Sequence, residues 1–258
     1  MFVDSHCHLN LLDLTPYEGD LNLALAEARA AGVHRFMAIS VNIDDHKILG
    51  DIAASHADVG YSVGVHPCEL PEVMQKASVE YLVQLAQNEK VWALGETGLD
   101  YYHSQEYVVE QKACFARHIE ASKIVKKPVV VHTRSAREDT VDLIRSERSE
   151  HGILHCFTED LDTAKAVLDC GYYISFSGII SFKNAQALRD VARYVPLDRL
   201  LIETDSPYLA PMPFRGKSNE PKYVPYVAQA LASVYGKTVE EIGELTSKNF
   251  EQLLKATV

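Results

Sequence analysis

The residues at the start of the chain are of the types that bind divalent metal ions. Asp4, His6 and His8 alternate along the sequence directly after the apolar pair Phe2 and Val3. Because successive side chains of a strand point to opposite faces, these three residues are expected to share one face. Neutral imidazole nitrogens are common ligands of divalent metals, so two of them at the end of a short strand form half of a metal site.

Four further residues of these types each follow an apolar run that is typical of a buried strand. They are Glu96 after residues 91–95, His132 after 128–131, His155 after 153–154 and Asp205 after the run 200–204. Ligand-type residues at the ends of five apolar runs are hard to attribute to chance. The sequence therefore predicts that the ends of the strands carry the reactive centre.

The apolar runs alternate with helix-like segments at intervals of about thirty residues. After the first strand, we expect strands at 36–39, 60–66, 91–96, 128–132, 152–156, 172–176 and 199–203. Helices are expected from Asp20 to Gly32, at 44–56, 78–89, 105–126, 135–148, 160–169, 183–194 and 221–235, and after a capping box formed by Thr238 and Glu241. This alternation predicts an α/β fold, a (β/α)₈ TIM barrel that forms a single domain over residues 1–258. In such a barrel the carboxyl ends of the strands meet at one mouth, where active sites lie.

The composition excludes several classes of protein. A net charge of -11 argues against a protein that grips duplex DNA with a broad basic face. The sequence lacks the basic region and apolar stretch of a signal peptide, and no apolar run approaches the length of a membrane span. The 5 Cys residues are scattered, with no C-x-x-C pair, which suits free thiols in a reducing compartment. We therefore expect a cytoplasmic protein that does not associate with a membrane.

Four His and two carboxylates exceed the four ligands of an ordinary tetrahedral zinc ion. They suit two divalent ions about 3.5–4 Å apart, the common arrangement for metal-assisted hydrolysis. The sequence leaves open whether these ions are Mg²⁺, Mn²⁺ or Zn²⁺. Glu96, central in strand order, is the candidate bridge, because the two oxygens of a carboxylate can bind different ions.

Six short segments, in this order, resemble the motif series of the TatD-type metal-dependent hydrolases. They are residues 4–8 (DSHCH), 64–67 (GVHP), 95–100 (GETGLD), 132–134 (HTR), 155–157 (HCF) and 203–207 (ETDSP), and the likeness extends to residues 215–221 (RGKSNEP). That family belongs to the amidohydrolase superfamily of metal-dependent barrels and includes deoxyribonucleases. The resemblance implies that one ion is bound by His6, His8, Glu96 and Asp205, and the other by Glu96, His132 and His155.

Four residues are candidates for contact with the substrate. His66 ends the third expected strand, and Arg134, Lys183 and Arg215 follow the fifth, seventh and eighth. Their loops border the mouth, where a guanidinium group is suited to binding phosphate. For His66, substrate contact and simple packing remain equal alternatives.

Other polar residues receive structural roles. His34 and His151 precede strands, and His46, His56 and His118 lie within expected helices, so we expect these five to be solvated. Glu203 lies two residues before Asp205, and either supports a metal ligand or is a satisfied polar group of the barrel. Asp100 and Tyr101 are expected to shape the loop after Glu96, without a chemical role.

These residues favour metal-dependent hydrolysis of a phosphodiester, with DNA as the substrate, at a strand end. Two divalent ions bring four positive charges against the two negative charges of Glu96 and Asp205, so the centre is positive within an acidic protein. Glu96 as the bridge and Asp205 as the base that takes a proton from water are the predicted catalytic residues. No obligate protein partner is inferred.

Two alternatives remain at this point. The same metal pair could hydrolyse a small-molecule amide, lactone or ester, which a pocket without cationic loop residues would favour. A non-catalytic metal-binding scaffold is the other alternative, and the complete set of ligand-type residues argues against it.

Overall fold

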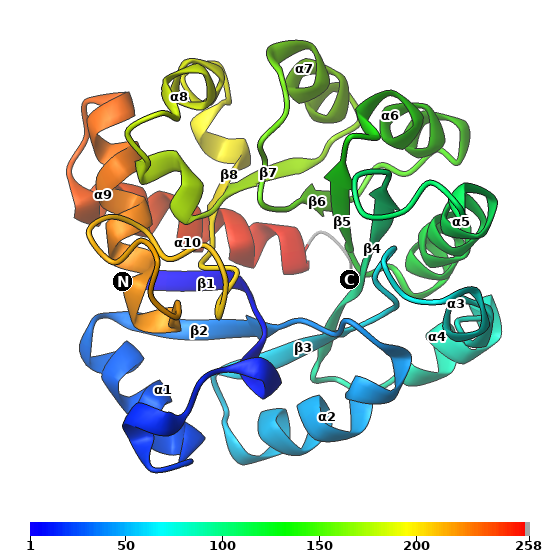
Figure 1. Cartoon of the computed structure of the whole chain (residues 1–258), viewed down its shortest axis with the longest axis horizontal. Coiled ribbons are helices and arrows are strands. Elements are labelled where there is room, and N and C mark those ends of the chain that lie inside the picture. Colours follow the sequence, from blue (N-terminus) through cyan, green and yellow to red (C-terminus); the bar gives the residue numbers. More distant parts are fainter. Residues whose placement is uncertain (256–258) are drawn as a thin grey trace.

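The computed structural model describes residues 1–255 and forms a barrel of eight parallel strands in sequential order, surrounded by helices (Figure 1). The strands are β1 (Phe2–Cys7), β2 (Val33–Ala38), β3 (Val59–Val63), β4 (Val91–Asp100), β5 (Val129–Arg134), β6 (Gly152–Leu154), β7 (Tyr173–Phe176) and β8 (Leu200–Ile202). The helices are α1 (Leu21–Ala30), α2 (His46–Ser55), α3 (Pro71–Lys76), α4 (Val79–Leu85), α5 (Val108–Val125), α6 (Arg137–Ser146), α7 (Leu161–Asp169), α8 (Gln186–Ala192), α9 (Val224–Tyr235) and α10 (Val239–Lys255). The predicted (β/α)₈ barrel is confirmed. Within residues 1–255, no helix is long and apolar enough to cross a membrane.

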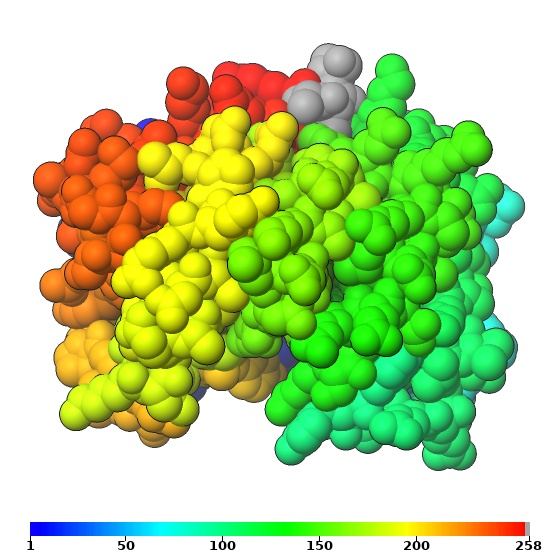
Figure 2. Space-filling view, turned by 90° about the horizontal axis from the view of Figure 1, so that it is seen from above, coloured from blue at the N-terminus to red at the C-terminus, as the bar shows by residue number. Residues whose placement is uncertain are grey.

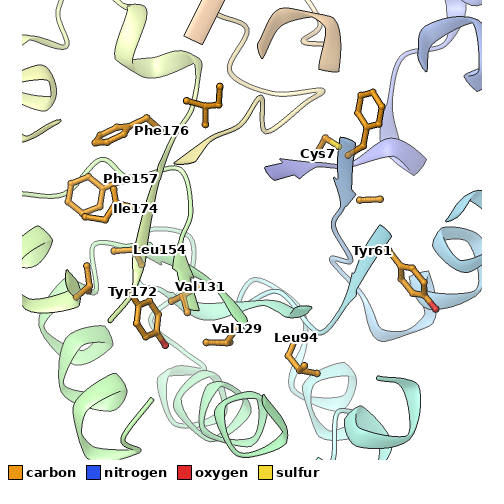
Figure 3. Close-up of a cluster of buried hydrophobic side chains, with 14 of the residues drawn as sticks. Cys7, Tyr61, Leu94, Val129, Val131, Leu154, Phe157, Tyr172, Ile174 and Phe176 are labelled. Atoms are coloured by element: carbon orange, nitrogen blue, oxygen red, sulfur yellow. The ribbon is translucent and has the colours of Figure 1, made fainter. Parts of the chain in front are cut away.

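The strand side chains alternate between two apolar layers. In β5, Val129 and Val131 pack outward against the helices, whereas Val130 points into the barrel. Figure 3 shows part of the outer layer, with side chains of several strands lying between the sheet and the helices. Because both faces of each strand are buried, the strands read as continuous apolar runs, and their positions could be predicted from them.

Helix α10 closes the end of the barrel opposite the mouth. Its Phe250 and Leu253 pack against the inward-facing side chains of the strands, and Phe250 contacts the ring of Trp92 edge to face. Asn249 donates to the carbonyl oxygens of Leu197 and Leu200, at the start of β8. The capping box predicted for this helix is present, since Thr238 and Glu241 exchange backbone-to-side-chain hydrogen bonds.

The first and last strands meet at the mouth. The backbone of Asp205 donates to the carbonyl oxygen of His6 (2.9 Å), and that of His8 donates to Ser206 (2.8 Å). The side chain of Asp4 accepts hydrogen bonds from the backbone of His6 (3.4 Å) and from the backbone (2.9 Å) and hydroxyl (2.6 Å) of Thr204. This contact ties β1 to the segment after β8 and thereby brings residues 6, 8 and 205 together.

Strand β4 is longer than the sequence predicts. It continues to Asp100, because residues 97–100 pair with residues 131–134 of β5. Between Leu94 and Thr97 the pairing shifts by one residue, and the backbone of Glu96 instead donates to the carbonyl oxygen of Ser40 (3.0 Å). This bulge turns Glu96 toward the barrel axis.

Three other expectations need correction. The sequence does not predict the short helix α3, which begins at Pro71. The helix predicted at 183–194 is shorter in the structure, where α8 spans Gln186–Ala192. His118 is not solvated: it is buried in α5, where its Nε2 accepts a hydrogen bond from the backbone of Val65 (3.2 Å). Position 118 follows Phe115 by three residues and Cys114 by four, which places it on the buried face of the helix.

Candidate active site

Glu96 lies at the centre of a buried cluster of imidazoles and carboxylates at the mouth of the barrel. Its Oε2 is 3.3 Å from His6 Nε2 and 3.9 Å from His8 Nε2. Asp205 Oδ1 completes this group, at 3.5 Å from His6 Nε2 and 3.4 Å from His8 Nε2. Figure 2 shows a recess at the lower edge of the molecule, where the mouth lies, while α10, in red, follows the opposite edge.

The other oxygen of Glu96 faces a second group. Oε1 is 2.8 Å from His155 Nε2, 3.2 Å from His132 Nδ1 and 3.4 Å from His66 Nε2. The structure therefore brings together all six residues that the sequence nominated as metal ligands. The two oxygens of one carboxylate face two separate sets of nitrogen atoms, which is the arrangement that a bridge between two ions requires.

The hydrogen-bond partners assign the protonated nitrogen of each ring. His8 Nδ1 lies 3.2 Å from the carbonyl oxygen of Ile39, His155 Nδ1 lies 3.2 Å from Glu203 Oε1, and His132 Nε2 lies 3.0 Å from Asp100 Oδ2. A neutral ring donates its one N–H to such an acceptor, so the lone pair of its other nitrogen faces Glu96. This outer support is usual around metal-binding imidazoles.

His66 differs from the other rings in this respect. Its Nδ1 accepts a hydrogen bond from the backbone of Cys68 (3.1 Å), so the neutral ring carries its proton on Nε2. That nitrogen, which faces Glu96 Oε1, is a donor and has no lone pair to offer a metal. The ring is half-buried, and its geometry suits a contact with an anionic substrate.

The electrostatics of the cluster also fit a cation. Neither ring nitrogen of the fully buried His6 makes a hydrogen bond within the described chain, which leaves Nε2 available. Burial alone would raise the pKa of Glu96, but the surrounding rings, His155 foremost, hold it well below its usual range. Burial likewise opposes ionisation of Asp205, yet the neighbouring imidazoles, His8 foremost, lower its pKa. Two ionised carboxylates at such depth need compensating positive charge, which divalent ions would supply in place of protons on the rings.

Comparison with known proteins agrees with this geometry. The family model described as "TatD related DNase" matches residues 3–255. The chain belongs to this family. Within the TatD family, this chain is 48% identical over 253 residues to the uncharacterized metal-dependent hydrolase YcfH of Escherichia coli. The aligned residues cover 97% of this chain and 94% of the relative. It is 36% identical to the uncharacterized metal-dependent hydrolase YabD of Bacillus subtilis, with 99% of each chain covered.

The fold is also that of a TatD homologue of known structure. The crystal structure of YjjV from Escherichia coli superimposes with a TM-score of 0.89 at 27% sequence identity, covering 98% of this chain and 97% of the other. The resemblance read from the motifs is thus confirmed, and the protein is a metal-dependent hydrolase of the TatD family.

Two carboxylates lie behind the rings, Glu203 beside His155 and Asp100 beside His132. Glu203 is a supporting residue, because its Oε1 accepts from His155 Nδ1 and from the backbone of Cys156 (2.9 Å). Asp100, for which the sequence predicts no chemical role, holds His132 through a hydrogen bond. Side chains alternate along a strand, so residues 96, 98 and 100 of β4 share one face. A predicted strand that continued past Glu96 would therefore have indicated that Asp100 faces the site.

Asp100 also lies beside residues that the sequence analysis did not single out. His103 Nδ1 is 2.8 Å from Asp100 Oδ2, and Cys68 Sγ is 3.5 Å from the same oxygen. Cys68 is exposed as a whole residue, but its thiol is partly shielded from solvent, and this shielding and the Asp100 carboxylate raise the pKa of the thiol to about 12. These two side chains lie outside the central cluster, on the rim of the mouth.

The three cationic candidates for substrate contact have exposed side chains; Arg134 is the last residue of β5, and Lys183 and Arg215 lie in the segments that follow β7 and β8. The guanidinium of Arg134 lies over the ring of Tyr102 at 3.9 Å, and that of Arg215 over the ring of Phe182 at 4.4 Å. Lys183 follows Phe182 directly. A cavity of about 660 Å³ opens beside Arg134, between the loops that follow β5 and β6.

Proposed function

We propose that this protein hydrolyses phosphodiester bonds of DNA with two divalent metal ions held by the central cluster. The observation that carries the proposal is the position of Glu96, whose two oxygens face two sets of nitrogen lone pairs. His6, His8, Glu96 and Asp205 would hold one ion, and Glu96, His132 and His155 the other. When bound, the ions would supply Lewis-acid activation of water and of the phosphoryl oxygen.

The side chains of the cluster divide the remaining tasks. Asp205 Oδ1 faces His6 and His8, which leaves its other oxygen to take the proton of the attacking water. His66 Nε2–H, at the open side of Glu96, would donate a hydrogen bond to an oxygen of the scissile phosphate. Glu203 and Asp100 keep His155 and His132 in the required orientation.

The cationic rim supports a polymeric substrate rather than a small ester. Arg134 is the last residue of β5, Lys183 and Arg215 follow β7 and β8, and all three side chains are exposed. Because the ions would engage only the scissile phosphate, the neighbouring phosphates of a strand need cations of their own. Such local charges allow a chain with a net charge of -11 to bind DNA near its end.

The test measures kcat/KM for single-stranded DNA, for RNA and for a small uncharged ester over a salt series. For single strands, the logarithm of the association constant for binding falls with log[salt], with a slope of about -0.7 per neutralised phosphate. We expect Arg215→Ala to weaken DNA hydrolysis and to flatten the salt slope by a fraction of a unit to about one, with ester hydrolysis little changed. Arg145→Ala, an exposed arginine in the last turn of α6 and away from the mouth, is the matched control.

Two results would contradict the proposal. If hydrolysis of DNA is insensitive to salt and to Arg215 while the ester is turned over faster, the protein acts on small molecules. If RNA is cleaved in preference to DNA, the metal chemistry stands but the substrate is wrong.

A further inference from the structure

Three potential metal ligands gather on the rim of the mouth, outside the central cluster. Cys68 follows β3, Asp100 ends β4, and His103 lies in the turn after it. The distances are 3.5 Å from Cys68 Sγ to Asp100 Oδ2, 3.7 Å from Cys68 Sγ to His103 Nδ1, and 2.8 Å from His103 Nδ1 to Asp100 Oδ2. Their ligand atoms lie within 4.8 Å of one another.

These spacings match one face of a tetrahedral zinc site. With Zn–S near 2.3 Å and Zn–N and Zn–O near 2.0 Å, tetrahedral angles separate sulfur from nitrogen or oxygen by about 3.5 Å, and nitrogen from oxygen by about 3.3 Å. Both sulfur distances already agree. Only the hydrogen-bonded pair of His103 and Asp100 would need to open, by about 0.5 Å, when an ion replaced the shared proton.

The donor set is also selective. It combines sulfur, nitrogen and oxygen, whereas Mg²⁺ and Mn²⁺ prefer oxygen ligands. Cys68 and His103 are exposed, so an ion can approach from solvent and keep a water as its fourth ligand. We propose that Cys68, Asp100 and His103 form a separate site for a thiophilic divalent ion such as Zn²⁺.

This site would be coupled to the central cluster through one atom. Asp100 Oδ2, the proposed ligand, is also the oxygen that accepts the Nε2–H of His132 at 3.0 Å. An ion on the rim would therefore weaken the hold of Asp100 on His132. This effect on His132 rests on the proposed function of the central cluster. Binding of an ion to the rim does not depend on that function.

The experiment uses Co²⁺ as the probe, since a cobalt–thiolate bond gives a charge-transfer band that cobalt bound to nitrogen and oxygen alone does not. The protein is titrated with Co²⁺ under reducing conditions, and the bound metal is counted after desalting. We expect the band in the wild type, its loss in Cys68→Ser and His103→Ala, and a stoichiometry lower by one ion in both variants. Cys170→Ser, a half-buried thiol after α7, is the control and should keep the band.

Absence of the band in the wild type, or its persistence in Cys68→Ser, would overturn the proposal. Melting temperatures identify any variant that is misfolded. This readout requires no turnover, so a failure of the rim site and a failure of the proposed DNA hydrolysis are distinguishable.

Discussion

His8, His155 and His132 are each held through the ring nitrogen that faces away from Glu96. The acceptors behind the rings are the carbonyl oxygen of Ile39, the carboxylate of Glu203 and the carboxylate of Asp100. A carboxylate in this position fixes the ring and makes the facing nitrogen more basic. The supporting residues should therefore affect metal affinity almost as much as the ligands do.

Glu203→Gln tests this at the residue scale. The amide keeps the size of the side chain and can still accept from His155 Nδ1, but it lacks the negative charge. We expect metal affinity to fall about 10–100-fold, measured by competition with a chromophoric chelator. Glu150→Gln, at an exposed carboxylate away from the mouth, should leave the affinity unchanged. Equal affinities for the two variants would mean that Glu203 only satisfies the backbone of Cys156.

His118 predicts a pH dependence of stability that is independent of the metal centre. Burial lowers its pKa from the ordinary 6.5 to about 4. Below pH 6.5 the unfolded chain therefore takes up a proton that the folded chain does not, and stability falls as the pH falls toward 4. At about 1.4 kcal/mol per pH unit, the contribution lost between pH 7 and pH 5 is about 2 kcal/mol.

Urea unfolding of the wild type and His118→Gln at pH 7 and pH 5 measures this loss. The glutamine can still accept from the backbone of Val65 but does not titrate, so the variant should lose about 2 kcal/mol less than the wild type over this interval. Parallel pH profiles would show that the ring titrates equally in both states.

At the scale of elements, β4 carries both Glu96, the central carboxylate of the site, and Asp100, which holds His132. Two glycines allow its close approach to β5. Gly95 and Gly98 both have φ of +134°, and a Cβ at Gly98 would lie 2.9 Å from the carbonyl carbon of His132. At these two positions the backbones of β4 and β5 approach each other more closely than an added side chain would allow.

Gly98→Ala should destabilise the protein and disturb its metal site together. We expect a loss on the order of 2–4 kcal/mol, from backbone strain and from overpacking, and weaker metal binding because His132 is displaced from Glu96. Gly19→Ala is the matched control: its φ of +82° is also positive, but nothing lies within 4 Å of the added Cβ. Loss of stability with unchanged metal affinity would mean that β5 shifts without moving His132.

The same strand marks the limit of prediction from sequence. Buried runs such as residues 128–131 predict a strand because β-branched side chains fit both layers, and the ligand-type residue after each run then falls at the mouth. Residues 97–100 (TGLD) are not an apolar run, and only pairing with β5 makes them a strand. Asp100, Cys68 and His103 meet through this tertiary pairing, so their cluster has no local signature.

At the scale of the whole molecule, the two ends of the barrel differ: one is apolar and contributes to stability, and the other carries the reactive side chains. Helix α10 and the apolar interior occupy one end, and the buried charges occupy the other. Glu96 and Asp205 remain ionised there only with compensating positive charge. Metal content should therefore influence the stability of the entire barrel.

Removal of the metal should lower the melting temperature and abolish hydrolysis. Return of Mg²⁺, Mn²⁺ or Zn²⁺ at 100 times its dissociation constant should restore about 2.7 kcal/mol per site, as measured by calorimetry. Glu96→Ala should bind fewer than two ions and lose several orders of magnitude in kcat while remaining folded. Full activity in a demonstrably metal-free preparation, or normal turnover in this variant, would exclude the proposed centre.

The meeting of β1 with the segment after β8 has a consequence for the synthesis of the protein. His6 leaves the ribosome before Asp205, because it lies 199 residues earlier in the chain. At about 5–20 residues per second, synthesis of the chain between these two residues takes roughly 10–40 s. Throughout that interval the nascent chain carries His6, His8 and later Glu96 without the strand that closes the ring around them. A complete metal centre can therefore form only after Asp205 has been synthesised, and chains that terminate before this residue would be inactive.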